Sequence, residues 1–253
     1  MPSRLITPEG EPASVVEFHH GQATLVAEAF GEGERVYVLL HGIGMGRSVF
    51  VDLAGRLPGR VIGIDLPGFG EAPEPASPLT MAEHADLVAA YLDAHRVSQA
   101  IIIGHSMGCQ VAMEMAVRSP ESVRALILAG PTVDPAARTL RQQAMRMLWD
   151  ILHERPVVIW RGAREYLRGG PRVFAKIRVM LDHRPEDLGP RVLVPALVVR
   201  GSHDEVAPED WGRRLAAIMP AATYAEIAGF RHETMIHNAA PMAALTEELA
   251  TSL

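Results

Sequence analysis

Short runs of branched apolar residues recur along the chain, and most end at a turn that contains glycine or proline. The runs are Val36–Leu40, Val61–Ile64, Ala100–Ile103, Ala125–Ala129, Ala196–Val199 and Thr223–Ile227. Each has the length of a buried strand and is shorter than a typical helix. Two earlier stretches are predicted to form antiparallel strands at one edge of the same sheet, namely Ser14–His19 and Ala23–Phe30.

Between these runs the apolar residues follow a helical period. Thr80 and Glu83 form a capping-box pair, which marks the start of a helix. The residues that would face the core then recur every three or four positions, at His84, Leu87, Val88, Tyr91 and Leu92. Strands that alternate with helices predict an α/β fold, in which a mostly parallel sheet carries helices on both faces.

The alternation stops in residues 131–190, which are rich in arginine, helical in pattern and contain Trp149 and Trp160. Pro156 and Pro171 divide this segment into about three helices, because proline is tolerated in the first turn of a helix but not in its interior. We therefore expect a helical cap, inserted in an α/β core that is formed by residues 1–130 and 191–253.

Composition narrows the class of protein. The chain has 253 residues, 48% of them hydrophobic, which suffices for one domain with a sizeable core. It has no apolar run of roughly 18 residues and no apolar leader, so we expect a cytoplasmic protein without a membrane partner. A single cysteine excludes an internal disulfide, and the histidines lack zinc-binding spacing. No metal and no cofactor are expected.

Charge is distributed unevenly along the chain. The net charge of −6 argues against nucleic acid as a partner, because phosphate contacts need a clustered basic surface. Residues 138–191 nevertheless hold twelve Lys/Arg against six Asp/Glu. Either ordinary ion pairs hold this basic segment to an acidic body, or some arginines attract an anionic substrate. The candidates are Arg138, Arg141, Arg161, Arg164 and Arg231.

The strongest chemical signal is the sequence GHSMG at Gly104–Gly108, which follows a predicted strand and precedes a stretch compatible with a helix. A G-x-S-x-G turn needs this context, since its glycines let the backbone bend sharply and expose the serine hydroxyl. The start of the helix then stabilises developing negative charge. Ser106 is therefore the candidate nucleophile. Cys109 lies outside the apex of the turn, and we interpret it as a buried apolar residue.

A second glycine-containing loop, His41–Gly44, follows the strand Val36–Leu40. A tetrahedral oxyanion needs two hydrogen-bond donors, and the backbone amides of Ile43 and Met107 are the natural pair. We interpret His41 as a residue that braces this loop by hydrogen bonding.

Together these motifs resemble the α/β-hydrolase superfamily, in the form that has a serine nucleophile and a helical cap. The resemblance covers nearly the whole chain, because His41-Gly42, Asp65–Gly70 and Gly104–Gly108 follow one another in the family's order and spacing. It implies a structural role for Asp65, on a loop that shapes one wall of the site. It also implies that the acid and the base of a catalytic triad follow later in the chain.

For the acid, the loop after the strand Ala196–Val199 resembles the family's acid loop and offers Asp204. Glu205 beside it remains an alternative. Asp134, after the strand Ala125–Ala129, is another, because some family members place the acid at that earlier position.

For the base, His232 matches the position of the family's histidine, just after the last predicted strand, and His237 remains an alternative. Arg231 precedes it where the family more commonly has glycine, which places a cation near the mouth of the site. The order Ser106, Asp204, His232 is the one expected for this fold.

The expected activity is hydrolysis of an ester-like bond of a small molecule (carboxylester, thioester or lactone) through an acyl-enzyme intermediate. Serine at the turn, in place of aspartate, argues against haloalkane dehalogenation and epoxide hydrolysis. The same triad also permits carbon–carbon bond hydrolysis or cofactor-free perhydrolysis. A third alternative is a non-catalytic small-molecule receptor, because a fold does not determine its function.

Overall fold

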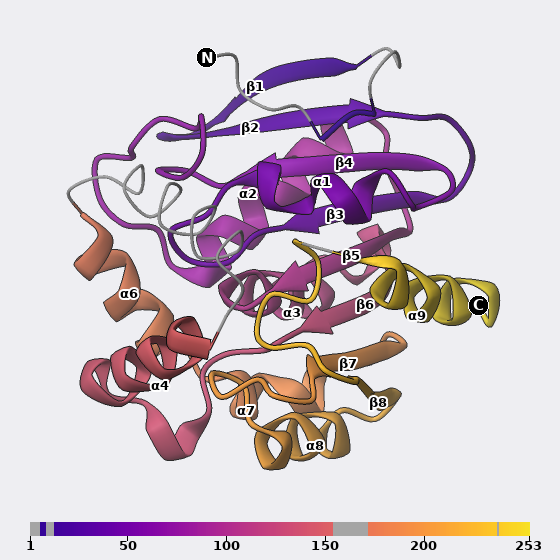
Figure 1. Cartoon of the computed structure of the whole chain (residues 1–253). Coiled ribbons are helices and arrows are strands. Elements are labelled where there is room, and N and C mark those ends of the chain that lie inside the picture. The colour runs from indigo at the N-terminus through magenta and orange to yellow at the C-terminus, as the bar shows by residue number, and fades with distance from the viewer. Residues whose placement is uncertain (1–5, 9–12, 154–171, 237) are drawn as a thin grey trace.

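The strands of the computed structural model form one sheet in the part of the chain that it describes, which is residues 6–8, 13–153, 172–236 and 238–253 (Figure 1). The strands are β1 (Ser14–His20), β2 (Ala23–Phe30), β3 (Val36–Leu40), β4 (Arg60–Asp65), β5 (Ala100–His105), β6 (Val123–Ala129), β7 (Ala196–Gly201) and β8 (Ala222–Ile227). Their order across the sheet is β1-β2-β4-β3-β5-β6-β7-β8. Every apolar run of the sequence therefore became a strand.

The direction of the strands also follows the prediction. Strands β3 to β8 pair in parallel, whereas β1 pairs antiparallel with β2 and β2 antiparallel with β4. The chain passes from β3 to β4 on one side of β3, and then crosses to β5 on the other side. The connections that follow the adjacent strands β3 and β5 therefore run in opposite directions across the sheet. Open α/β sheets bind ligands at the carboxyl ends of the strands where this reversal occurs.

Helices cover both faces of the sheet in Figure 1. In the described residues they are α1 (Val51–Ala54), α2 (Met81–Ala94), α3 (Met107–Arg118), α4 (Leu140–His153), α6 (Val173–Asp182), α7 (Pro185–Leu188), α8 (Glu209–Ile218) and α9 (Ala240–Thr251). Short 3-10 turns span Arg47–Phe50, Pro120–Ser122, Pro135–Ala137 and Gly189–Arg191. No helix among these is long and apolar enough to span a bilayer.

The core has two layers, one on each face of the sheet, because neighbouring side chains of a strand point to opposite sides. In β3, Val38 and Leu40 pack with the buried residues of α2, α3 and α8. Tyr37 and Leu39 pack with those of α1 and α9. A parallel strand buried on both faces reads as a continuous apolar run, which is why the sequence showed it clearly.

Helix α2 begins where the sequence predicts. The amide of Glu83 donates to Oγ1 of Thr80 at 3.2 Å, and the amide of Thr80 donates to Oε2 of Glu83 at 2.7 Å. These reciprocal bonds satisfy two amides that the first turn of a helix leaves without a partner.

Helices α4, α6 and α7 lie in the segment that was predicted to form a cap, after β6 and before β7. Pro156, Trp160 and Pro171, on which the prediction of three helices depended, lie outside the described residues. The fold class is confirmed. The division into residues 1–130 with 191–253 as core and 131–190 as cap stays a prediction.

Candidate active site

The candidate nucleophile lies at the sharp turn between β5 and α3. Ser106 has φ 52° and ψ −115°, and only 4% of it is exposed. A positive φ is unfavourable for a residue with a side chain, so the surrounding structure must hold it in place. The amide of Ser106 donates a hydrogen bond to the carbonyl oxygen of Ala129 on β6, at 2.9 Å. The neighbouring strand thus fixes the backbone of the nucleophile.

Glycines allow three segments to meet at this turn. A Cβ at Gly108 would lie 2.1 Å from the carbonyl oxygen of Leu40, so α3 begins directly against the end of β3. A Cβ at Gly42 would lie 3.1 Å from Cβ of Ser106. The loop that was predicted to stabilise an oxyanion therefore packs against the candidate nucleophile.

The candidate base and acid are in contact. Nδ1 of His232 lies 2.9 Å from Oδ2 of Asp204, and both side chains are almost completely buried. The other carboxylate oxygen of Asp204 accepts hydrogen bonds from the amides of Val206 at 2.9 Å and Ala207 at 2.8 Å. A carboxylate held in this way is an acceptor, so Nδ1 of His232 carries the proton and Nε2 carries the lone pair that a base needs.

Gly130 lies between this pair and the turn at Ser106. A Cβ at Gly130 would lie 2.9 Å from Nδ1 of His232 and 3.1 Å from Oδ2 of Asp204. Gly130 directly follows Ala129, whose carbonyl oxygen accepts the amide hydrogen of Ser106. The end of β6 therefore contacts all three residues of the predicted triad, Ser106 through Ala129 and His232 with Asp204 through Gly130.

Arg200 supports the acid loop, and the sequence analysis missed this residue. It is 5% exposed, and its guanidinium donates to the carbonyl oxygens of Asp204 and Ala207, both at 2.9 Å. Glu226 on β8 pairs with the same guanidinium at 2.6 Å. The available signal was an arginine inside the otherwise apolar strand β7, since a buried cation needs carbonyl or carboxylate partners.

His41 braces the oxyanion loop as expected. The amide of Leu66 donates to its Nε2 at 3.1 Å, so Nε2 accepts, and Nδ1 donates to the carbonyl oxygen of Gly42 at 2.8 Å. Burial lowers the pKa of this imidazole, which keeps it neutral. Because a peptide is planar and trans, fixing the Gly42 carbonyl also fixes the N–H of Ile43, which points the opposite way.

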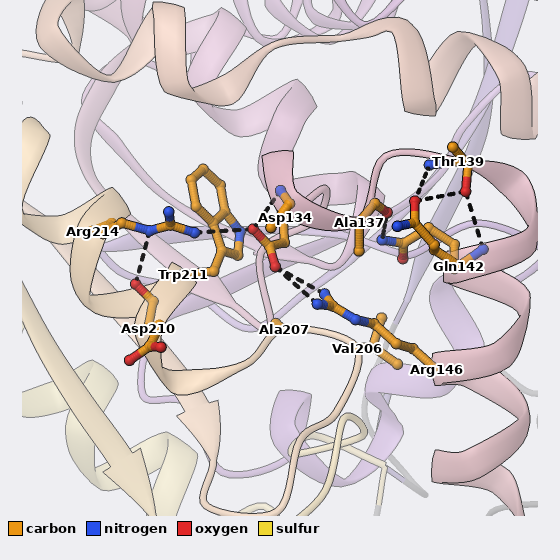
Figure 2. A network of polar contacts seen from close by, with 12 residues as sticks. Asp134, Ala137, Thr139, Gln142, Arg146, Val206, Ala207, Asp210, Trp211 and Arg214 are labelled. Carbon is orange, nitrogen blue, oxygen red and sulfur yellow. Dashed lines mark hydrogen bonds and ion pairs between the residues drawn. The ribbon is translucent and has the colours of Figure 1, made fainter.

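Asp134, the alternative acid, lies in a different network (Figure 2). Arg146 of α4 donates to its Oδ2 with two nitrogens at 3.0 Å, and Arg214 of α8 donates to its Oδ1 at 3.0 Å. The amide of Ala136 also donates to Oδ1 at 3.0 Å. Figure 2 shows the carboxylate between the two guanidinium groups. The structure thus brings Asp204, and not Asp134, into hydrogen-bonding contact with His232.

The remaining candidates lie elsewhere. Glu205 is exposed, and His237 falls outside the described residues. Asp65 accepts hydrogen bonds from the amides of Arg47 and Glu71, and it pairs with the buried Arg47 guanidinium. These contacts are those of a structural residue, as the sequence predicted for Asp65.

Cys109 is fully buried, and its Sγ donates to the carbonyl oxygen of Gly104 at 3.1 Å. Burial raises the pKa of this thiol well above its ordinary value. The thiolate that a cysteine nucleophile needs is therefore disfavoured. No cluster of metal-ligating side chains is found in the described ranges.

Helix α6 contacts the wall of the site through a buried lysine. Nζ of Lys176 donates to the carbonyl oxygen of Gly68 at 2.6 Å, pairs with Glu74 at 2.7 Å and lies 4.5 Å from the ring centre of Phe69. The Phe69 ring in turn lies edge-on to His41, with 5.3 Å between ring centres. The cap segment therefore contacts Phe69, which in turn contacts His41.

The five arginines that were proposed to attract an anionic substrate have different surroundings. Arg138 donates to the carbonyl oxygen of Leu181 at 3.1 Å and pairs with Glu186 at 2.6 Å, as ordinary ion pairing predicts. Arg141 is exposed, whereas Arg161 and Arg164 fall outside the described residues. Arg231 lies 3.4 Å from the carbonyl oxygen of His203. Attraction of an anionic substrate by these residues stays a prediction.

Comparison with known proteins agrees with this architecture. A family model described as alpha/beta hydrolase fold matches residues 36–153. The uncharacterized hydrolase YugF of Bacillus subtilis is 25% identical over 181 residues, which cover 61% of this chain and 66% of that protein, just under two thirds of its length. Five further relatives are matched over 17% to 31% of their lengths.

Several matches extend over nearly the whole chain, and two of them serve as examples. A pimeloyl-acyl-carrier-protein methyl ester esterase of Chromobacterium violaceum is 29% identical over 257 residues, covering 90% of this chain and 98% of that protein. The structure of a thermophilic esterase from Thermogutta terrifontis superimposes with a TM-score of 0.81 at 21% identity, over 94% of this chain and 98% of that chain. The family model, the structural match, the sheet order and the turn at Ser106 agree, so the chain has the α/β-hydrolase fold.

Proposed function

We propose that the protein is a serine hydrolase that cleaves an ester-like bond of a small molecule, a carboxylester, thioester or lactone, through an acyl-enzyme intermediate. One observation carries this proposal: Ser106 occupies a turn with a positive φ, beside the hydrogen-bonded pair of His232 and Asp204. The similarity to a methyl ester esterase and to a thermophilic esterase supports ester substrates. A cytoplasmic location is part of the proposal.

In the first step, Nε2 of His232 takes the proton from Oγ of Ser106 while Oγ attacks the carbonyl carbon of the substrate. Asp204 holds the imidazole in the tautomer that leaves Nε2 basic, and its negative charge stabilises the imidazolium that forms. The amides of Val206 and Ala207 keep that carboxylate in place during the step.

The carbonyl oxygen of the substrate becomes an oxyanion, which the amides of Ile43 and Met107 stabilise. Met107 is the first residue of α3, and the first amides of a helix have no acceptor within the helix. The Ile43 amide is oriented through the bond from His41 to Gly42. Donors of this kind contribute about 3–4 kcal/mol each to transition-state stabilisation in serine hydrolases.

The tetrahedral intermediate then collapses. The bond from the carbonyl carbon to the leaving group breaks, and the leaving group takes the proton from Nε2 of His232. A water molecule next donates its proton to Nε2 and attacks the acyl carbon. Collapse of this second intermediate releases the acid and returns the proton to Oγ of Ser106.

The test is steady-state hydrolysis of p-nitrophenyl acetate, combined with covalent labelling by a fluorophosphonate. We expect the wild-type protein to turn over repeatedly and to gain one label, which peptide mass spectrometry places on Ser106. Ser106→Ala should lose both properties and keep its fold, whereas Cys109→Ala should keep both. Undiminished labelling of Ser106→Ala would contradict the proposal. A single slow acylation without turnover would instead indicate a receptor.

A further inference from the structure

The residue before the candidate nucleophile is a buried histidine with a defined proton position. His105 is 0% exposed, and its Nε2 lies 3.2 Å from the backbone carbonyl oxygen of His232. A carbonyl oxygen can only accept a hydrogen bond, so Nε2 of His105 carries the proton and donates it. In a neutral ring, Nδ1 then carries the lone pair.

This bond supports an irregular part of the chain. His232 lies in an irregular segment between β8 and α9, outside any strand or helix. Its carbonyl oxygen also accepts the amide of Thr234 at 3.2 Å, and its side chain binds Asp204. A side-chain donor from β5 therefore adds a contact between the base and the strand that carries the nucleophile.

The ring of His105 packs against both neighbouring loops. Its centre lies 4.8 Å from that of the His232 ring. On its other side, a Cβ at Gly42 would lie 3.0 Å from Nδ1 of His105. The ring thus fills the space between the base segment and the oxyanion loop, and a displaced ring would move one of them.

His105 stays neutral in this place. Nδ1 has no hydrogen-bond acceptor among the described residues, so a second proton there would be buried without a partner. Burial, followed by the nearby His232, lowers the pKa of His105 well below its ordinary value. The ring therefore keeps its single proton on Nε2 and does not compete with His232 as a base.

We propose that His105 is a positioning residue, whose Nε2–H holds the backbone of His232 so that the base is aligned with Ser106. This inference rests on the proposed function, because alignment matters only if His232 acts on Ser106. His105 acts through His232 and does not touch the substrate. Its loss should therefore lower kcat and leave KM nearly unchanged.

Two variants separate the hydrogen bond from the packing. His105→Phe keeps a planar ring and removes the donor, whereas His105→Gln keeps a donor N–H at similar reach. With p-nitrophenyl acetate, we expect His105→Phe to lower kcat and the rate constant of fluorophosphonate labelling roughly 10- to 100-fold, with KM within about twofold. His105→Gln should recover most of both rates.

His84→Phe is the matched control, since His84 is also a buried imidazole but lies on α2. It should keep the wild-type kcat. Wild-type rates in His105→Phe, or equal losses in His105→Phe and His105→Gln, would overturn the inference. A wild-type protein that neither turns over nor labels would overturn the proposed function itself.

A measurement on the unmodified protein keeps the inference testable if His105→Phe does not fold. In a long-range proton–nitrogen spectrum, the His105 ring should show the neutral Nε2–H tautomer from pH 5 to pH 9. A proton on Nδ1 would contradict the bond to the His232 carbonyl and with it the positioning role.

Discussion

Gly130 lies so close to His232 that a Cβ at this glycine would come within 2.9 Å of Nδ1 of the imidazole. Gly130→Ala should therefore push His232 away from Asp204. We expect kcat on p-nitrophenyl acetate to fall by about 100-fold, since small misplacements of catalytic groups have effects of that size.

Gly130 also has φ +55°, so part of the effect on stability comes from the backbone. Gly21→Ala is the control, because Gly21 has φ +60° with no atom within 4 Å of an added Cβ. Both variants should lose about 1 kcal/mol of unfolding free energy for their φ angles, as measured by urea titration. Only Gly130→Ala should lose activity, and equal kcat values in the two variants would refute the contact argument.

The two candidate acids should respond differently to the same change. Asp204→Asn replaces the carboxylate that holds His232, so kcat should fall by orders of magnitude, up to about 10⁴-fold. Asp134→Asn should change kcat only a few-fold, because Asp134 binds Arg146 and Arg214. It should instead destabilise the fold by about 1–3 kcal/mol, since a buried polar network loses its charge. The opposite ranking of kcat would assign the acid to Asp134.

Acid should destabilise the fold through buried histidines. Burial lowers the pKa of His84 to about 3, from an ordinary value of 6.5, with His41 and Lys176 adding to the effect. Below pH 6.5 the unfolded chain takes up a proton at this imidazole and the folded chain does not. The free energy of unfolding should then fall by up to about 1.4 kcal/mol per pH unit, and this contribution is lost progressively between pH 6.5 and pH 3.

Urea midpoints of the wild type, His84→Phe and His19→Phe at pH 8, 6 and 5 would check this prediction. His84→Phe should show a shallower pH dependence than the wild type. His19 is exposed on β1, so His19→Phe should match the wild type. Identical slopes in all three proteins would show that His84 is protonated equally in the folded and unfolded chains.

The thiol of Cys109 should be inert in the native protein, because it is fully buried and burial raises its pKa. The reactive species is the thiolate. With Ellman's reagent at pH 8 we expect no reaction within the time in which a free thiol reacts completely. One equivalent should react after unfolding in guanidinium chloride. Rapid reaction of the native protein, absent in Cys109→Ala, would contradict the burial of this side chain.

The sequence predicted the central strands well because they are buried on both faces. Val36–Leu40 is identical in prediction and structure. Strand β4 is longer than its apolar run by Arg60 and Asp65. Arg60 pairs with Val36 on β3 and Asp65 with Val26 on β2, so neighbouring strands extend the ladder over polar residues. Such extensions depend on the partner strand and are invisible in a local pattern.

At the site, local motifs pointed to Ser106 and to the loop His41–Gly44, because a turn depends on adjacent residues; their roles as nucleophile and oxyanion loop stay predictions. The choice between Asp204 and Asp134 depended on contacts across the fold, which spacing does not encode. Arg200 and His105 were missed because their partners lie far from them in the sequence or are backbone carbonyl groups, which no residue type marks.

The double pairing of Asp134 bears on the free energy that separating α4 from the core would cost. Breaking a buried ion pair is costly mainly when it leaves one charge buried alone. If α4 moved away with Arg146, Asp134 would keep Arg214 and the amide of Ala136 as partners. The carboxylate would still have a cation and an amide beside it, so separating Arg146 from Asp134 would cost less than separating a buried pair that has no other partner.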